Sequence, residues 1–405
     1  MRTTDLPARV RRAQRRHQVV MLALVAPSIV FLALFFVAPL GFFLFRSVDN
    51  SEVPGWLPRT VGTLAHWNGN GLPDEAAYRA VAEDLVALSG STALPLLGRR
   101  LNHNLPGFRG LITGTGNRVD LQHSGSMREQ LVSIDARWGE SIYWQTIRRE
   151  RHVLTPFYLL TALDLRHGTS GDLERVPGDS AIFLGLLGRT LSISVVVTLL
   201  CVLLGFPVAA TMAGSSPARA NALLILVLIP FWTSLLVRST AWVILLQNQG
   251  VVNQALVGLG VIDRPMPLIF NRLGLYIAMV HVLLPFMVLP LYSVLKGIPP
   301  ELMRAASSLG ASPWTAFLRV YVPQALPGIA AGASLVFVLA LGYYVTPALV
   351  GGPGDQMIGY FIAYFTNTAV NWGMASALGT ILLIVVSLIY LALGRIVGLD
   401  RLAVR

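Results

Sequence analysis

Long apolar stretches alternate with shorter polar ones along most of this chain. Six of the apolar stretches are close to or above the roughly 20 residues that an α-helix needs to cross a bilayer. They cover residues 19–45, 191–212, 222–246, 273–295, 329–350 and 375–393. Because only helices and closed barrels satisfy their backbone groups in lipid, this pattern predicts an all-α polytopic membrane protein with six transmembrane helices.

The largest polar segment, residues 47–180, lies between the first two apolar stretches. Within it, residues 74–89 carry alanine, valine and leucine at helical spacing after two acidic residues, which predicts a helix, and residues 141–152 predict another. Residues 68–71 and 113–117 are rich in glycine and asparagine and predict turns. Since the segment is far longer than an ordinary loop, we expect an insert domain with a core of its own.

Composition agrees with the membrane class, because 54% of the residues are hydrophobic and 13% are charged. The net charge of +11 is unevenly spread. Residues 47–180 hold 13 arginines against 15 acidic residues, whereas the rest of the chain holds 18 basic against 5 acidic residues. This excess flanks the apolar stretches, so it indicates membrane topology and not a nucleic-acid interface. The single cysteine, Cys201, excludes a disulfide framework and is expected to pack as a small hydrophobe.

The distribution of arginine also predicts which side of the membrane each end faces. Six arginines lie within residues 1–18, so this basic segment is expected in the cytoplasm. The apolar stretch that follows is too long for the core of a cleaved signal peptide. An even number of spans returns the tail, residues 398–405, to the cytoplasm, and its arginines agree. The insert is therefore expected outside the cytoplasm.

The longest polar interruption in the second half of the chain, residues 299–328, is expected to be a structured element. Pro300 followed by Glu301 suits the first turn of a helix, where the missing N–H is harmless and an acid complements the dipole. Gly310 suits a left-handed helix end. We therefore predict a short helix over residues 301–310.

A second short helix is predicted to follow directly. Ser312 is a good N-cap for a helix over residues 314–321. Pro323 and Pro327 are expected to end this element. Two short helices around a glycine would form a rigid knob between two spans that a soluble partner could grip.

These residues resemble the EAA loop in permease subunits of ATP-binding-cassette (ABC) importers of the spermidine/putrescine-like family. That family reads roughly Glu-Ala-Ala, a following glycine and a distal Leu-Pro. The corresponding residues here are Arg304, Ala305, Ala306, Gly310 and Val322 with Pro323. The resemblance extends to residues 230–242 (PFWTSLLVRSTAW), 281–292 (HVLLPFMVLPLY) and 340–353 (ALGYYVTPALVGGP). Arg304 departs from the family glutamate.

The resemblance implies a type I ABC permease core over residues 188–397, with a cytoplasmic coupling loop at residues 296–327, in a bacterial inner membrane. Such a subunit would form a heterodimer with a second permease and work with two cytoplasmic ABC ATPase subunits and an extracytoplasmic solute-binding protein. The residues expected to couple to the ATPase are Glu301, Arg304, Ala305, Ala306, Gly310, Pro323 and Pro327.

The cofactors implied are ATP and magnesium on the ATPase partner, with no cofactor, metal or nucleic acid on this chain. The chain has one lysine, Lys296, and no GxxxxGK[ST] loop, so it lacks the nucleotide-binding signature. The transported solute would be small and organic, either polyamine-like or derived from an amino acid. The chain is not expected to be an enzyme.

Polar and aromatic side chains within the apolar stretches are the candidates for the translocation pathway. They are Trp232, Ser234, Arg238, Tyr343, Tyr344 and Thr346. Arg238 would either meet an anionic substrate group or bond to backbone carbonyls of a broken helix. His281 is expected to pack as a neutral side chain. The prolines expected to interrupt spans are Pro230, Pro285, Pro290 and Pro347.

Two other function classes stay open. A secondary transporter usually carries a mid-membrane carboxylate, and none of the 20 acidic residues lies in an apolar stretch. A membrane-anchored receptor or enzyme would work through residues 47–180, but the five histidines there lack the HExxH spacing and no GxSxG motif occurs. The insert itself would either dock the solute-binding protein or pack against the transmembrane core.

Overall fold

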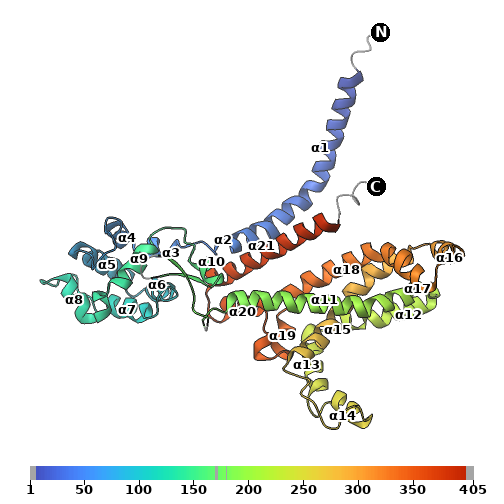
Figure 1. Cartoon of the computed structure of the whole chain (residues 1–405). Helices are drawn as coiled ribbons and strands as arrows, with labels where there is room; N and C mark the ends of the chain where they lie inside the picture. Colours follow the sequence, from blue (N-terminus) through green and yellow to red (C-terminus); the bar gives the residue numbers. More distant parts are fainter. Residues whose placement is uncertain (1–5, 169–171, 179, 398–405) are drawn as a thin grey trace. The chain divides into compact units, whose positions relative to one another are not determined.

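Helices account for nearly all of the regular structure, as the alternation of apolar and polar stretches predicted (Figure 1). The computed structural model describes residues 6–168, 172–178 and 180–397. The predicted cytoplasmic tail and the first five residues of the predicted basic N-terminus lie outside these ranges. The chain divides into two compact units, Met1–Glu174 with Trp372–Ile381, and Arg175–Asn371 with Leu382–Arg405.

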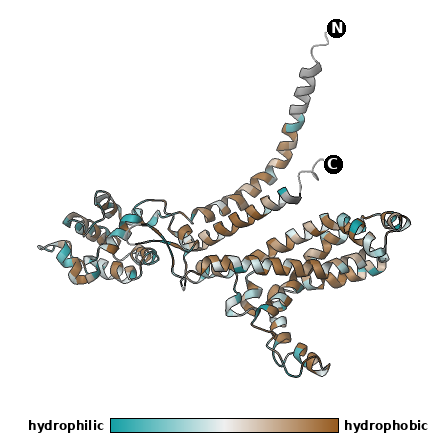
Figure 2. Cartoon of the chain, viewed as in Figure 1, coloured by the Kyte–Doolittle hydropathy of each residue, from teal (hydrophilic) through white to brown (hydrophobic). Residues whose placement is uncertain are grey.

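The first unit begins with an apolar helix made of α1 (Leu6–Leu32), a π-helical turn (Ala33–Val37) and α2 (Ala38–Phe45). Its portion His17–Phe45 is long and apolar enough to cross a membrane. The side chains of Phe35, Phe36 and Phe42 are exposed, as expected for a surface in contact with lipid. Figure 2 shows α2 and the adjoining part of α1 coloured mostly as hydrophobic. The hydroxyl of Ser376 donates to the carbonyl of Phe43, which ties the first turns of α21 (Trp372–Val397) to α2.

The insert, residues 47–180, is a set of short helices followed by a two-stranded sheet. The helices are α3 (Glu52–Trp56), α4 (Pro58–Leu64), α5 (Glu75–Leu88), α6 (Ala93–Asn102), α7 (Phe108–Gly116), α8 (Met127–Ile134), a 3₁₀ turn (Ala136–Gly139), α9 (Ser141–Arg149) and α10 (Phe157–Ala162). The strands are β1 (Leu165–His167) and β2 (Leu173–Arg175).

The insert has its own core, as expected from its length. Four aromatic side chains, Tyr78, Phe108, Trp138 and Trp144, are fully buried in it. Their polar atoms are satisfied locally, because the Tyr78 hydroxyl (2.9 Å) and the Trp144 indole N–H (3.0 Å) both donate to the carbonyl of Trp138. The Trp138 indole donates to the hydroxyl of Thr115 at 2.8 Å. Large aromatic rings can therefore be buried without unpaired polar groups.

The two helices predicted in the insert are confirmed. α5 begins after Asp74, whose side chain accepts a hydrogen bond from the backbone N–H of Ala77, and α9 begins at Ser141. The turn predicted at residues 113–117 is wrong, because residues up to Gly116 belong to α7. Gly116 is buried against Leu94 of α6, so its lack of a side chain serves close helix packing and not a turn.

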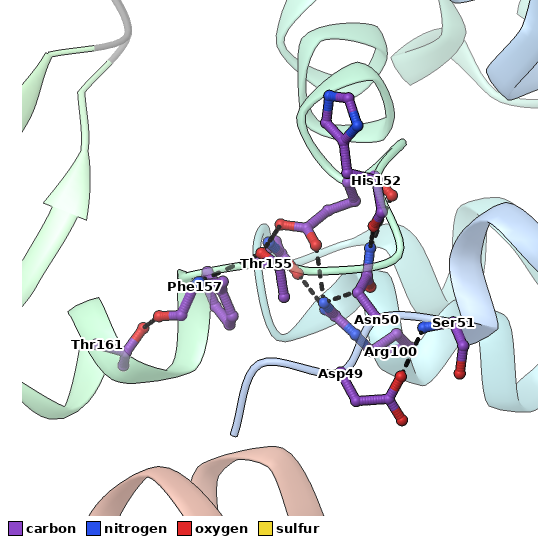
Figure 3. Close-up of polar contacts among 10 residues, drawn as sticks. Asp49, Asn50, Ser51, Arg100, His152, Thr155, Phe157 and Thr161 are labelled. Carbon is purple, nitrogen blue, oxygen red and sulfur yellow. Dashed lines mark hydrogen bonds and ion pairs between the residues drawn. The ribbon is translucent and has the colours of Figure 1, made fainter. Parts of the chain in front are cut away.

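A buried network of charged and amide side chains joins Asn50, before α3, to α6 and to the residue that follows α9 (Figure 3). Arg100 and Glu150 form an ion pair of 2.8 Å with only 5% and 4% of their side chains exposed. Arg100 also donates to the amide oxygens of Asn50 (2.7 Å) and Asn104 (2.5 Å), and Asn104 donates to Glu150 at 2.6 Å. Each buried charge thus has several partners, which a buried ion pair requires.

In the second unit, α11 (Phe183–Ala213), α15 (Arg272–Lys296) and α18 (Val322–Gly342) pack into a shared core. Glycines make the close approach possible. A Cβ at Gly205 would lie 2.9 Å from Met287, and one at Gly332 would lie 2.8 Å from the sulfur of Met287. Small residues at helix contacts are typical of membrane helices, which cannot rely on the hydrophobic effect to associate.

The stretch predicted as one span at residues 222–246 is bent. It consists of α12 (Pro217–Leu228), a 3₁₀ turn (Ile229–Trp232) and α13 (Leu235–Leu246), which continues toward α14 (Val251–Gly258); the break is 98°. Pro230 lies in the break, as expected, and the Ser234 side chain caps α13 by accepting from the N–H of Val237. Counting this pair as one span, the described chain has six helical segments that could cross a membrane.

Pro285 and Pro290 do not interrupt a span, contrary to expectation, because both lie inside the continuous helix α15. Such prolines are tolerated in membrane helices when neighbouring helices enclose the freed backbone groups. The stretch predicted as one span at residues 329–350 does break, between α18 and α19 (Val345–Val350). Pro347 lies within α19, after the break. The chain continues through a 3₁₀ turn (Pro353–Asp355) and α20 (Ile358–Asn367) to α21.

Candidate functional site

The loop after α15 holds the residues predicted to couple to an ATPase. The helix α16 (Pro300–Ser308) starts at Pro300 with Glu301 in its first turn, and Gly310 follows with a φ of +84°. Ser312 caps α17 (Pro313–Ala316) by accepting from the backbone N–H of Thr315. The helix start, the glycine and the second cap are therefore as predicted. Leu309, with 89% of its side chain exposed, stands between the two helices.

Arg304, which departs from the family glutamate, pairs with Glu301 on the same helix. The guanidinium donates to the carboxylate at 2.7 Å, and both side chains are mostly exposed. Neighbours Ala305 and Ala306 keep that part of α16 narrow. An exposed pair of this kind adds little stability. Together, Glu301 and Arg304 contribute no net charge to the surface of α16.

Pro323 and Pro327 do not end the second helix of the loop, contrary to expectation. α17, a π-helical turn (Phe317–Tyr321) and α18 form one helix, Pro313–Gly342, that is long and apolar enough to cross a membrane. The wider π turn lets the N–H of Val322 bond to the carbonyl of Phe317, directly before Pro323. A π turn beside a proline bends a helix without stopping it.

This long helix ends where the chain leaves helical conformation at Tyr343 and Tyr344. Tyr343 has extended dihedrals (φ −72°, ψ 132°), and Tyr344 leads directly into α19. Non-helical backbone at membrane depth is tolerated only where protein covers it or where it lines a cavity. Gly359 of α20 packs against this break, since a Cβ there would lie 3.3 Å from the Cβ of Tyr344.

Six polar or aromatic side chains gather near this break, and we call them the polar cluster. They are Arg238, Ser239, Trp242, His281, Tyr343 and Thr346. The hydroxyls of Ser239 and Thr346 lie 3.1 Å apart and are buried. The indole N–H of Trp242 donates to Nδ1 of His281 at 3.2 Å. These contacts join α13 to α15 and α19.

Arg238 supplies the charge of the polar cluster. Its guanidinium interacts electrostatically with His281 and with the phenol of Tyr343. Its Nε is buried, and no partner for it occurs in the described part of the chain. All the candidate spans are free of acidic residues, so no carboxylate within them compensates this charge. A half-buried arginine whose Nε has no partner favours an anionic or carbonyl group as a partner.

The structure brings together only part of the predicted pathway set. Arg238, Tyr343 and Thr346 lie in the polar cluster, and Tyr344 is its neighbour at the helix break. Ser234 is the cap of α13, and Trp232 lies at the bend before it with 75% of its side chain exposed. Among the described contacts, no hydrogen bond or ring contact joins Trp232 to the polar cluster.

Sequence reasoning missed two members of the polar cluster and undervalued a third. Trp242 lies four residues after Arg238, so both side chains are on the same face of α13. Ser239 and Thr346 are 107 residues apart, and nothing local in the sequence pairs them. His281 was expected to be simply packed, whereas its ring accepts the hydrogen bond of Trp242. The i, i+4 spacing was the one signal available beforehand.

Long apolar helices, one broken span and a cluster of polar side chains beside them are typical of a polytopic membrane protein. Residues 186–400 match the family model described as "Binding-protein-dependent transport system inner membrane component". The chain therefore belongs to this family and is a permease subunit of an ABC importer. This assignment does not favour the alternatives of a secondary transporter or of a membrane-anchored receptor or enzyme.

Curated relatives agree with the family. The spermidine/putrescine transport system permease protein PotB of Escherichia coli is 36% identical over 53% of this chain and 78% of its own length. The PotB of Haemophilus influenzae is 33% identical over 51% of this chain and 73% of its own. The inner membrane ABC transporter permease protein YdcU of E. coli is 35% identical over 52% and 70%. The family match begins at residue 186, after the insert.

Proposed function

We propose that this chain forms half of a heterodimeric translocation pathway, together with a second permease of similar fold. Two cytoplasmic ATPase subunits would bind ATP and magnesium, and an extracytoplasmic solute-binding protein would deliver the solute. The names of the relatives, transport system permeases, support a multi-subunit importer. Hydrolysis is assigned to the partner because this chain has no GxxxxGK[ST] loop.

One observation carries the mechanism: a single helix, Pro313–Gly342, runs from the coupling loop to the break at Tyr343. When the ATPase subunits close on ATP, they would displace α16 and the exposed Leu309. The long helix would transmit this displacement to Tyr343 and its neighbours in the polar cluster. The backbone there is already non-helical, so it can change its dihedral angles at little cost.

The coupling role is tested in the reconstituted transporter with Gly310→Trp, for which we expect ATP hydrolysis without solute uptake. Gly310 has a φ of +84°, a conformation that other residues adopt only with strain, so the substitution distorts the turn between α16 and α17. Gly260→Trp is the matched control, because Gly260 also has a positive φ (+70°) and open space around it, but lies outside the loop. Equal uptake in both variants would contradict the proposal.

The proposed solute is a small organic molecule, polyamine-like or derived from an amino acid. The relatives named for spermidine and putrescine support the first. A polycation would be recognised here by the faces of Tyr343 and Tyr344, since acids are absent from the candidate spans, or by the second permease. An amino-acid derivative would instead place its carboxylate on Arg238. The solute that stabilises the cognate binding protein against heat would decide between them.

The proposed orientation places both termini and the coupling loop in the cytoplasm and the insert outside, in a bacterial inner membrane surrounded by lipid. The single native cysteine, Cys201, is buried, so introduced cysteines can be labelled selectively. Ser89→Cys in the insert and Ser308→Cys in the coupling loop both replace exposed residues. A membrane-impermeant maleimide should label Ser89→Cys in spheroplasts and Ser308→Cys only after permeabilisation. The reverse pattern would refute the orientation.

A further inference from the structure

The insert contains a pocket of about 530 Å³ that the family match does not include. Its wall is formed by residues 104–106 after α6, by α9 and the residue after it, by the start of α10, by the strand β1 and by Glu174 of β2, all within one compact unit. A pocket of this size is within the range that encloses small organic ligands. The residues that line it precede the segment that matches the permease family, so that family match assigns them no function.

One side of the pocket is the buried network shown in Figure 3. From this network, Glu150, Asn104 and Thr155 line the pocket. Their polar atoms are already engaged: Glu150 by Arg100 and Asn104, and the Thr155 hydroxyl by the N–H of Phe157. The charge of Glu150 is therefore cancelled by Arg100. This side is polar but satisfied, so it would shape the pocket and not attract a charged group.

The remaining charged side chains of the pocket do not cancel. Arg166 and Glu174 face each other across a loose, exposed contact of 3.7 Å. Arg149 donates one hydrogen bond, from Nη2 to the carbonyl of Gly168 at 3.1 Å, and no carboxylate pairs with it in the described part of the chain. With Glu150 paired to Arg100 and Glu174 to Arg166, the guanidinium of Arg149 leaves one uncompensated positive charge at the pocket.

Apolar side chains form much of the rest of the wall. They are Leu105, Pro106, Ile142, Pro156, Phe157, Leu160 and Leu165. A ligand that suits this surface needs a hydrocarbon or aromatic body, because burying apolar area is favourable and a polar body would lose its hydration. The uncompensated positive charge of Arg149 favours a ligand with one anionic group. A polyamine, by contrast, would bring positive charge next to Arg149 and Arg166.

We propose that this pocket binds a small amphipathic monocarboxylate. The carboxylate would accept two hydrogen bonds from Arg149, an arrangement that the planar guanidinium favours. The apolar body would lie against Ile142 and Leu160. None of the residues that line this pocket belongs to the proposed translocation pathway, so the inference does not depend on the proposed transport function.

Calorimetric titration of the full-length permease in lipid nanodiscs tests the proposal. The probes are phenylacetate, 4-phenylbutyrate and indole-3-acetate, each compared with its own amide, and 4-phenylbutylamine as the matched cation. At least one carboxylate should bind about tenfold or more tightly than its amide, since a hydrogen bond to a charged group is worth that much. Arg149→Gln should lose about tenfold in affinity, and Arg149→Lys should retain part of it.

The control variant is Arg109→Gln, which removes an exposed arginine of the same domain that does not line the pocket. Its affinity should equal that of the unaltered protein. The proposal is overturned if no carboxylate binds more tightly than its amide, if the cation binds best, or if Arg109→Gln weakens binding as much as Arg149→Gln. Because the readout is binding, a failure of solute uptake in the transporter would leave this test unaffected.

Discussion

The insert and the permease core are both helical, but they bury different side chains. The insert encloses Trp138, Trp144 and other large rings. Figure 2 shows hydrophilic residues interspersed among hydrophobic ones along its helices. The core brings α11, α15 and α18 together at glycines, while Leu199 and Leu203 on α11 remain 62% and 67% exposed. The insert is therefore organised like a water-soluble domain, in which the hydrophobic effect buries the apolar side chains. The core is built for lipid, where close packing at small residues holds helices together.

The two regions also treat charge differently. In the insert, Arg100 and Glu150 form an ion pair that is almost completely buried and surrounded by amide partners. In the described part of the core, the ion pairs are exposed or at the ends of helices, as with Glu301 and Arg304. Arg238 is a half-buried charge of the core, and no candidate span contains an acid that could pair with it. The substitutions below test these contrasts, beginning with the largest effect.

Breaking the buried ion pair should damage the insert most. Arg100→Met leaves the carboxylate of Glu150 buried without its partner, which costs about 3–5 kcal/mol of unfolding free energy. Limited proteolysis of the full-length protein in urea would show earlier cleavage within the insert. Arg59→Met is the control, because its pair with Glu83 is exposed and worth less than about 1 kcal/mol. Equal effects would show that burial of the pair is unimportant.

The insert should also lose stability in mild acid. Burial, together with the charges of Arg100 and Arg99, lowers the pKa of His103 to about 4. The unfolded chain, with a histidine pKa of about 6.5, takes up the proton first as the pH falls. The free energy of unfolding of the insert therefore does not depend on His103 above about pH 6.5. It falls progressively between pH 6.5 and pH 4, by at most about 3 kcal/mol.

His103→Gln should remove that pH dependence, whereas His66→Gln, at an exposed position, should leave it in place. The measurement is the urea midpoint for proteolysis of the insert at pH 7 and pH 4.5. Asp135 does not add to the change between pH 7 and pH 4.5. The hydrogen bond from Arg137 lowers the pKa of Asp135, so its contribution to the stability of the insert is lost only at still lower pH. A slope that persists in His103→Gln would assign the effect to other groups.

In the core, adding one methyl group at a helix contact should be costly. Gly332→Ala places a Cβ 2.8 Å from the sulfur and 3.0 Å from the carbonyl oxygen of Met287, so α15 and α18 must separate, at about 1–3 kcal/mol. Gly185→Ala, in α11 with open space around it, should be neutral or stabilising. Cys201 lies buried in this core, so a thiol-reactive dye reports its thermal opening without contribution from the insert. Equal melting temperatures would contradict close packing.

Restoring the family glutamate should have the smallest effect. Arg304→Glu removes the contact with Glu301, but both side chains are about two-thirds or more exposed. The change in core stability should therefore stay within about 0.5 kcal/mol. The same dye assay measures it, with Gly332→Ala as the sensitive reference. A larger loss would mean that the pair holds α16 in place.

Patterns that act between neighbouring residues were read correctly from the sequence. The helix start at Pro300, the glycine at Gly310 and the cap at Ser312 depend on adjacent backbone groups, and all three are present. Two local rules failed where the surroundings overrode them. Pro285 and Pro323 lie in continuous helices, and the glycines near residue 114 lie in α7, because packing with other helices compensates the weak local preference.

The amino-acid sequence by itself determined the membrane class, the number of apolar stretches, the helix starts and the glycine turn of the loop after α15, and the existence of an insert with its own core. These follow from hydropathy and turn chemistry, which are properties of consecutive residues. Only the tertiary structure decided that Trp242 meets His281, that Ser239 meets Thr346, and that Arg100 meets Glu150, 50 residues away. Such pairs depend on which helix faces pack together, and that choice is made by the shape of the whole fold.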